Sequence, residues 1–197
     1  GRLTRYRPPS EFQSSEYIVR NDTGVFEGGE ISMYYDPMIA KLCTWAPTRS
    51  EAIAHMRKAL DGFEVEGIGH NLPFLSAVMD HPRFIKGDIT TAFIEEEYPE
   101  GFIGVELPES ELLRIAASCA AMNRVAEIRR TKISGRMDNH ERRVGDNWVV
   151  TLQNNKYELN IVADQLGSTV RFEDGLRIRV EGSWTPGDQL ANMLVDD

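Results

Sequence analysis

The sequence predicts an α+β chain in two parts: a mixed lobe of short strands and helices, then a long helix with antiparallel strands. The first part alternates turn-rich stretches with apolar residues at helical spacing. The second part opens on an apolar helical pattern and changes to a period of two after Asn147. We therefore expect the architecture to change near Pro108.

The first third of the chain predicts short strands separated by turns. Ile31–Tyr35 has strand character, and the Asp36-Pro37 pair interrupts it. Met38–Trp45 is apolar enough for a buried strand, with Lys41 as its one charge.

The clearest helix start lies at Thr48-Arg49-Ser50-Glu51, which has the form of a capping box. The residues that follow at helical spacing define one buried face: Ala52, Ile53, Met56, Ala59, Leu60 and Phe63. Further along we expect a short strand at Val65–Gly69, a helix capped by Asn71, and a short helix over Thr91–Glu97.

Glu109–Ile128 predicts one long helix, apolar over most of its circumference. Such a helix is normally surrounded by protein. We therefore expect the remainder of this part to enclose it.

The strands after Asn147 predict an antiparallel sheet, because Asn154-Asn155 and Asp174-Gly175 are hairpin signals. Gln189–Val195 is expected to be the fifth strand. Five such strands around a helix leave an exposed edge. We therefore expect the chain to be part of something longer.

The composition excludes several classes of protein. The net charge of −9 argues against broad nucleic-acid binding, and no apolar run is long enough to span a membrane. No signal peptide is visible. The two cysteines, Cys43 and Cys119, lie far apart in apolar surroundings, which favours buried free thiols in a reducing compartment.

Most catalytic motifs are absent from the sequence. It has no P-loop and no dinucleotide fingerprint, and its four histidines show no metal-ligand spacing. We expect His55, on the exposed side of a helix, and His81, before a proline in a loop, to be structural. No metal site and no complete active site are predicted.

A basic stretch separates the long helix from the strands. Residues 124–143 hold seven Lys or Arg against three Asp or Glu. One interpretation is a solvated loop, and the other is a docking arm for an acidic or protein partner, because arginine is the favoured interface cation.

Arg20 is the other candidate residue, in Val19-Arg20-Asn21-Asp22-Thr23-Gly24. Asp22 lies two residues on, so both side chains share one face of an extended strand. The pair is either a structural ion pair or a means of presenting a planar donor fork to an anionic or carbonyl oxygen.

Several stretches of the sequence carry a family resemblance. Val19–Gly24, followed by Gly28–Leu42 with its Tyr-Tyr-Asp-Pro-Met run, resembles the C-terminal end of a biotin carboxylase domain. His70-Asn71-Leu72, Arg83–Thr91 and Tyr98–Phe102 resemble the propionyl-CoA carboxylase α subunits in particular. The remainder is similar to the BT domain of that family, in which an antiparallel β-barrel wraps a long helix.

The resemblance implies a biotin carboxylase part over residues 1–104 and a truncated BT domain over 105–197. It implies that Arg20 binds the ureido oxygen of biotin and acts in catalysis. It also implies that Arg136, Arg142 and Arg143, in the basic stretch, dock the carboxyltransferase β subunit.

The family implies an ATP-dependent ligase that uses biotin, ATP and Mg or Mn, in the bacterial cytoplasm or the mitochondrial matrix. The implied partners are the β subunit and the biotin carboxyl carrier domain of the same chain. The nucleotide and metal residues are expected before Gly1 and the biotinylation site after Asp197, so this segment alone is expected to be inactive. The alternatives are a 3-methylcrotonyl-CoA carboxylase α subunit and a purely structural docking module.

Overall fold

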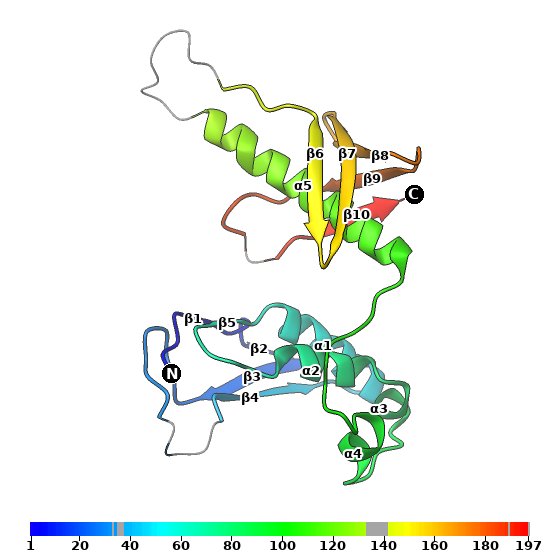
Figure 1. The fold of residues 1–197 in the computed structure, drawn as a ribbon. Helices are drawn as coiled ribbons and strands as arrows, with labels where there is room; N and C mark the ends of the chain where they lie inside the picture. The colour runs from blue at the N-terminus through cyan, green and yellow to red at the C-terminus, as the bar shows by residue number, and fades with distance from the viewer. Residues whose placement is uncertain (33, 35–37, 133–141, 189, 197) are drawn as a thin grey trace. The chain divides into compact units, whose positions relative to one another are not determined.

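The computed structural model describes residues 1–32, 34, 38–132, 142–188 and 190–196. Its contacts divide the chain into two compact units, Gly1–Val105 and Glu106–Asp197 (Figure 1). Within the described residues, no helix is long and apolar enough to cross a lipid bilayer.

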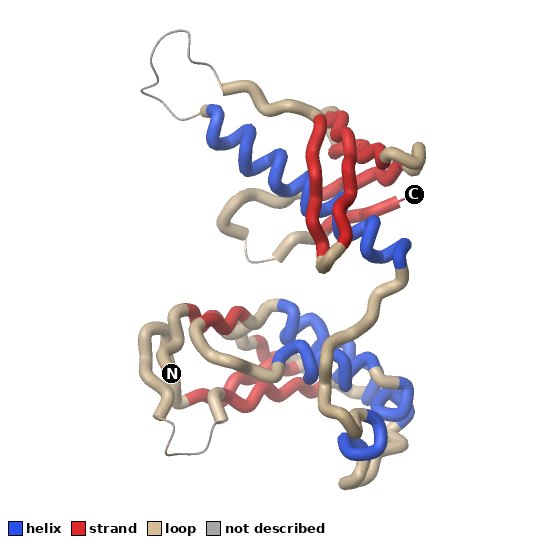
Figure 2. Tube along the Cα trace, viewed as in Figure 1, coloured by secondary structure: helices blue, strands red, loops and turns tan. Residues whose placement is uncertain are grey.

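The first unit combines short strands with helices (Figure 2). Strand β1 pairs with β5, and a second antiparallel sheet has the order β2-β3-β4. The elements are β1 (Arg5–Arg7), β2 (Phe12–Gln13), β3 (Ile18–Thr23), β4 (Ala40–Trp45), α1 (Arg49–Asp61), β5 (Glu64–Glu66), α2 (Leu72–Asp80), α3 (Pro82–Lys86) and α4 (Phe93–Glu97).

Helix α1 covers one face of the β2-β3-β4 sheet. It contacts both β3 and β4, and the hydroxyl of Thr44 in β4 donates to the carbonyl of Ala52 in α1 over 2.9 Å. Thr44 lies opposite the buried Val19 of β3. Because side chains alternate along a strand, the residues next to Val19 and Thr44 point to the other face.

The predicted capping box is confirmed. The Glu51 N–H donates to the Thr48 hydroxyl, and the Thr48 N–H donates to the Glu51 carboxylate. The position predicted for the start of α2 is confirmed, since Asn71 is its N-cap residue, but the Asn71 side chain makes no capping hydrogen bond. The Leu72 N–H donates to Nδ1 of His70 instead.

Two strand predictions in this unit are wrong in part. Ile31 and Ser32 lie outside any strand, although an isolated Arg2–Glu30 bridge and a hydrogen bond from the Ile31 N–H to the Gly1 carbonyl lie beside them. Met33 and Tyr35, the other part of this prediction, lie outside the described residues. Strand β4 begins only at Ala40 and is not fully buried, because one face of its sheet is open. Its last residue, Trp45, is 49% exposed.

Three smaller predictions also need correction. Strand β5 begins at Glu64 rather than Val65 and ends before Gly67, whose φ of 95° leaves the strand region. Helix α4 begins at Phe93 rather than at Thr91. His55 is half-buried, because its ring stacks on Tyr17 at 3.9 Å between centroids.

Helix α3 was not predicted, and it changes the role of His81. Nδ1 of His81 accepts from the Arg83 N–H and caps α3, while Nε2 lies 3.1 Å from the Glu97 carboxylate of α4. Arg83 donates to Glu96 and Glu97, and its hydrogen bond holds the pKa of Glu97 below its usual range. These ion pairs join α3 to α4.

The second unit is a long helix packed on an antiparallel sheet. The sheet has the order β10-β9-β8-β7-β6, so each strand pairs with its neighbour in sequence. The elements are α5 (Glu109–Thr131), β6 (Asn147–Leu152), β7 (Asn155–Ala163), β8 (Gly167–Phe172), β9 (Arg177–Gly182) and β10 (Met193–Asp196).

The core of this unit lies between one face of α5 and one face of the sheet. The helix contributes mainly small residues, and the sheet contributes every second residue of its strands. The members are Leu112, Ala116, Ala117, Ala120, Ala121, Tyr157, Leu159, Ile161, Val170, Phe172, Ile178 and Val180.

The prediction that protein surrounds α5 is wrong for the residues described. Cys119 is exposed and Val125 is 42% exposed, whereas Ala116 and Ala117 are fully buried. Small side chains let the helix backbone approach the sheet, so the buried face of α5 consists mainly of alanines, with Leu112 near its start. The prediction that both thiols are buried is also wrong, because Cys119 is exposed and Cys43 is only partly buried.

The alternating strands β6 to β9 and the Asp174-Gly175 hairpin are confirmed, with Gly175 at a φ of 90°. The fifth strand predicted over Gln189–Val195 is wrong in part: β10 covers only Met193–Asp196, and Gln189 lies outside the described residues. The turn between β6 and β7 lies at Gln153-Asn154, one residue earlier than predicted. Among the described residues β6 and β10 do not pair with each other, so both are edges of the sheet.

The turn between β7 and β8 is built on Asp164. Its carboxylate accepts from the N–H groups of Leu166 and Gly167 and from both Nη groups of Arg179. The Arg179 guanidinium and these N–H groups hold the pKa of Asp164 well below its usual range.

We expect Asp164→Asn to lower the thermal midpoint at neutral pH. Because the folded-state pKa is depressed, the ionised carboxylate stabilises the fold above the unfolded pKa of about 3.9, and this stabilisation is lost as the pH falls through the lower folded value. Thermal unfolding from pH 7 to pH 2 should show the gap to the parent chain closing below about pH 4. A gap of constant size would contradict this assignment.

Candidate functional site

Arg20 lies on the open face of the β2-β3-β4 sheet. In register it stands opposite Cys43 of β4, and Asp22 stands opposite Lys41. These four residues alternate with Val19 and Thr44, which face α1. The side chains of Arg20 and Asp22 are 62% and 50% exposed.

The predicted pairing of Arg20 with Asp22 is confirmed. Nε of Arg20 lies 2.9 Å from Oδ1 of Asp22, and Nη2 donates to Oδ2 over 3.1 Å. Two parallel contacts between a guanidinium and a carboxylate fix orientation as well as distance.

The surroundings keep Arg20 charged. The negative charge of Asp22, and then its hydrogen bonds, raise the pKa of Arg20 above its usual value, with a smaller effect from Cys43. The Cys43 sulfur lies 4.0 Å from Nη2. The site therefore offers a permanent cation beside a thiol.

The guanidinium has one occupied edge and one available edge. Asp22 takes Nε and Nη2, while Nη1 makes no hydrogen bond to any residue that the structure describes. An exposed Nη1 can donate to an anionic oxygen brought to this face. An arginine arranged in this way can bind a carboxylate, a phosphate or another anionic oxygen.

The basic stretch is only partly described. Arg136 lies outside the described residues. Arg142 forms an ion pair with Glu127 of α5, a buried carboxylate that also pairs with Arg130. Arg143 is exposed. The structure thus gives Arg142 an intramolecular contact that the sequence did not indicate.

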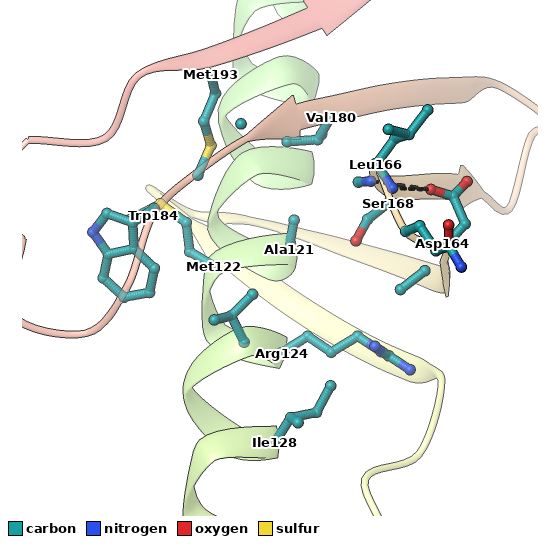
Figure 3. A pocket seen from close by; sticks show the side chains of 15 residues that line it. Ala121, Met122, Arg124, Ile128, Asp164, Leu166, Ser168, Val180, Trp184 and Met193 are labelled. Atoms are coloured by element: carbon teal, nitrogen blue, oxygen red, sulfur yellow. Dashed lines mark hydrogen bonds between the residues drawn. The ribbon is translucent and has the colours of Figure 1, made fainter.

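A separate hollow of about 310 Å³ lies in the second unit, beside α5 and the ends of β8 and β9 (Figure 3). Arg124 lines it, with its side chain 18% exposed and Nη2 donating to Asp146 over 3.3 Å. Nε of Arg124 has no partner among the described residues. Asp164, which also lines the hollow, is engaged by Arg179, and among the described lining residues there is no other acid and no histidine.

The sequence missed Cys43 as a neighbour of Arg20. The two are joined only by the register of β3 on β4, which no local pattern encodes. Among the described residues, no group of three or more His, Cys, Asp or Glu lies close enough to hold a metal ion.

Both units of the chain match known protein families. Residues 1–96 match the family model "Biotin carboxylase C-terminal domain", and residues 115–197 match "Propionyl-coenzyme A carboxylase BT domain". The propionyl-CoA carboxylase alpha chain of Ruegeria pomeroyi is 69% identical over all of this chain. The chain belongs to the biotin-dependent acyl-CoA carboxylase family, as a segment of its alpha chain.

Two further relatives belong to the same family. The mitochondrial propionyl-CoA carboxylase alpha chain of Homo sapiens is 34% identical over 98% of this chain. The mitochondrial methylcrotonoyl-CoA carboxylase subunit alpha of Dictyostelium discoideum is 36% identical over 55% of it. The chain spans 31% of the Ruegeria relative, 26% of the human one and 16% of the Dictyostelium one.

Proposed function

We propose that this chain is part of the alpha subunit of a propionyl-CoA carboxylase, a ligase that carboxylates biotin at the expense of ATP. The observation that carries the proposal is the 69% identity to such an alpha chain, which extends across both units. In this proposal residues 1–104 complete the biotin carboxylase domain and residues 105–197 begin the BT domain. The division of contacts after Val105 supports these boundaries.

Within this proposal, Arg20 contacts biotin. Biotin supplies a ureido nitrogen that accepts the carboxyl group, while negative charge develops on the ureido oxygen. A fixed guanidinium at that oxygen stabilises the developing charge, because its donors need no reorientation during the reaction. The available edge of Arg20, with Nη1 unpaired by described residues, supports this role.

The remaining groups bind outside this segment. We propose that ATP and Mg or Mn bind to chain regions not represented here, and that biotin is attached to the carrier domain of the same chain. The compartment we propose is the bacterial cytoplasm or the mitochondrial matrix. The human relative is a mitochondrial protein.

The overall reaction can be tested directly. The full-length alpha chain, mixed with its β subunit, ATP, Mg and radiolabelled bicarbonate, should carboxylate propionyl-CoA faster than 3-methylcrotonyl-CoA. The reverse preference would favour the 3-methylcrotonyl-CoA carboxylase alternative. Failure to carboxylate either substrate, or free biotin, would leave the purely structural docking module.

We further propose that Arg136, Arg142 and Arg143 dock the carboxyltransferase β subunit. The excess of positive charge in residues 124–143 of an acidic chain supports this. Changing all three arginines to glutamate should weaken association with the β subunit by about tenfold or more, while biotin carboxylation persists.

The control for this docking test changes the same amount of charge elsewhere in the unit. Lys156, Arg171 and Arg177 are exposed on the strands, so their reversal to glutamate should leave association unchanged. Arg142 pairs with Glu127, so the triple variant also loses that ion pair. A double variant changed only at Arg136 and Arg143 keeps the ion pair and therefore tests docking alone. Unaltered co-elution of the triple variant with the β subunit would contradict the assignment.

A further inference from the structure

The environment of Arg20 raises the question of what holds its guanidinium in place. Its side chain is 62% exposed, and long exposed side chains normally sample several rotamers. A donor that stabilises charge on a reacting oxygen must be held within about 0.5 Å of its productive position. Some neighbour must therefore restrain Arg20.

The contacts identify one restraining residue. Asp22 engages Arg20 through two atom pairs, 2.9 Å at Nε and 3.1 Å at Nη2. Cys43 lies farther away, at 4.0 Å, and Lys41 carries the same charge as Arg20. Both Arg20 and Asp22 lie on β3, so the backbone of one paired strand fixes their separation.

The two contacts also decide which donors remain. With Nε and Nη2 bound to Asp22, the edge that carries Nη1 faces away from the carboxylate. Nη2 also makes a weak contact of 4.0 Å with the Cys43 sulfur, so Nη1 is the donor without a partner among the described residues. A guanidinium released from Asp22 could instead present any of its donors. The Asp22 carboxylate thus leaves only one edge of the Arg20 guanidinium available to a ligand.

We propose that Asp22 is a positioning residue for biotin carboxylation, which clamps the Nε and Nη2 edge of Arg20 and presents the remaining edge to the biotin oxygen. This inference rests on the proposed function. Asp22 itself touches no reacting atom and acts only through Arg20. Asp22→Asn keeps one acceptor oxygen but loses the negative charge and the second oxygen. Asp22→Glu keeps the negative charge and both oxygens on a longer side chain.

The test uses the full-length alpha chain and the ATP-dependent carboxylation of free biotin. Asp22→Asn should lower kcat by about tenfold or more, as expected for a misplaced catalytic group, and Asp22→Glu should recover part of the loss. Glu11→Gln is the matched control, because the Glu11 carboxylate accepts from the Asn21 N–H next to the pair and has no other hydrogen bond or ion pair among the described residues. It should retain the parent rate.

A double variant separates positioning from a structural role. If Asp22 acts only through Arg20, Arg20→Ala combined with Asp22→Asn should be no slower than Arg20→Ala alone. A further fall by the same factor would overturn the proposal, as would a parent rate for Asp22→Asn. A parent rate for Arg20→Ala would instead defeat the proposed role of Arg20 itself.

A second measurement does not depend on activity. Phenylglyoxal attacks the neutral form of an arginine side chain through its Nη atoms, so the Asp22 contact should slow modification of Arg20. Mass spectrometry of the peptide that contains Arg20 should therefore show faster modification in Asp22→Asn than in the parent chain or in Glu11→Gln. Equal rates in all three proteins would show that the clamp does not persist in solution and would overturn the proposal.

Discussion

Replacing Arg20 with alanine is expected to slow carboxylation of biotin by the full-length alpha chain by about 100- to 1,000-fold. Loss of one preorganised donor at an oxygen that gains charge has effects of this size. The guanidinium is clamped by Asp22 and open to solvent, so its loss should remove the donor without disturbing the sheet.

The variant Arg20→Lys tests whether the geometry of the guanidinium matters in addition to its positive charge. Arg20→Lys keeps the positive charge but cannot make the two-atom contact with Asp22, so we expect a rate between those of the parent and the alanine variant. Thermal unfolding should show similar midpoints for all three, and binding of the β subunit should survive. A normal rate for Arg20→Ala would leave Arg20 with a structural role only.

Replacing Ile161 with alanine is expected to destabilise the chain by about 2–5 kcal/mol, the range for truncating a large buried aliphatic side chain. Ile161 is fully buried in β7 opposite Val170, which is also fully buried, and both belong to the core under α5. The alanine variant leaves a cavity that a close-packed core fills only in part.

The matched control lies on the other face of the same sheet. Val149 in β6 is 59% exposed, so Val149→Ala should change the free energy of unfolding by no more than about 0.5 kcal/mol. Urea unfolding followed by circular dichroism measures both variants. Similar losses at the two positions would mean that the core does not lie on the α5 face of the sheet.

Local signals in the sequence predicted much of this fold. The capping box at Thr48 and the hairpin at Asp174-Gly175 depend on residues within a few positions of each other, and both form as expected. The period-two strands are equally local, because one buried face requires alternation. These features need no knowledge of distant parts of the chain.

Other features depend on contacts between distant residues and could not be predicted. Burial on α5 follows the alanines because the helix lies close to the sheet, and apolar content alone gave the wrong result for Cys119 and Val125. At the candidate site, the Arg20–Asp22 pair followed from strand alternation, whereas its position opposite Cys43 required the register of β3 on β4. The role of Arg20 rests on family likeness, because one ion pair is compatible with several functions.

The continuity of α5 has a mechanical consequence. The helix runs for 23 residues without proline or glycine, a length of about 35 Å at 1.5 Å per residue. Its alanine face rests on a close-packed sheet, which resists bending and sliding. The two ends of α5, near Glu109 and near Arg129, are therefore held at a fixed separation.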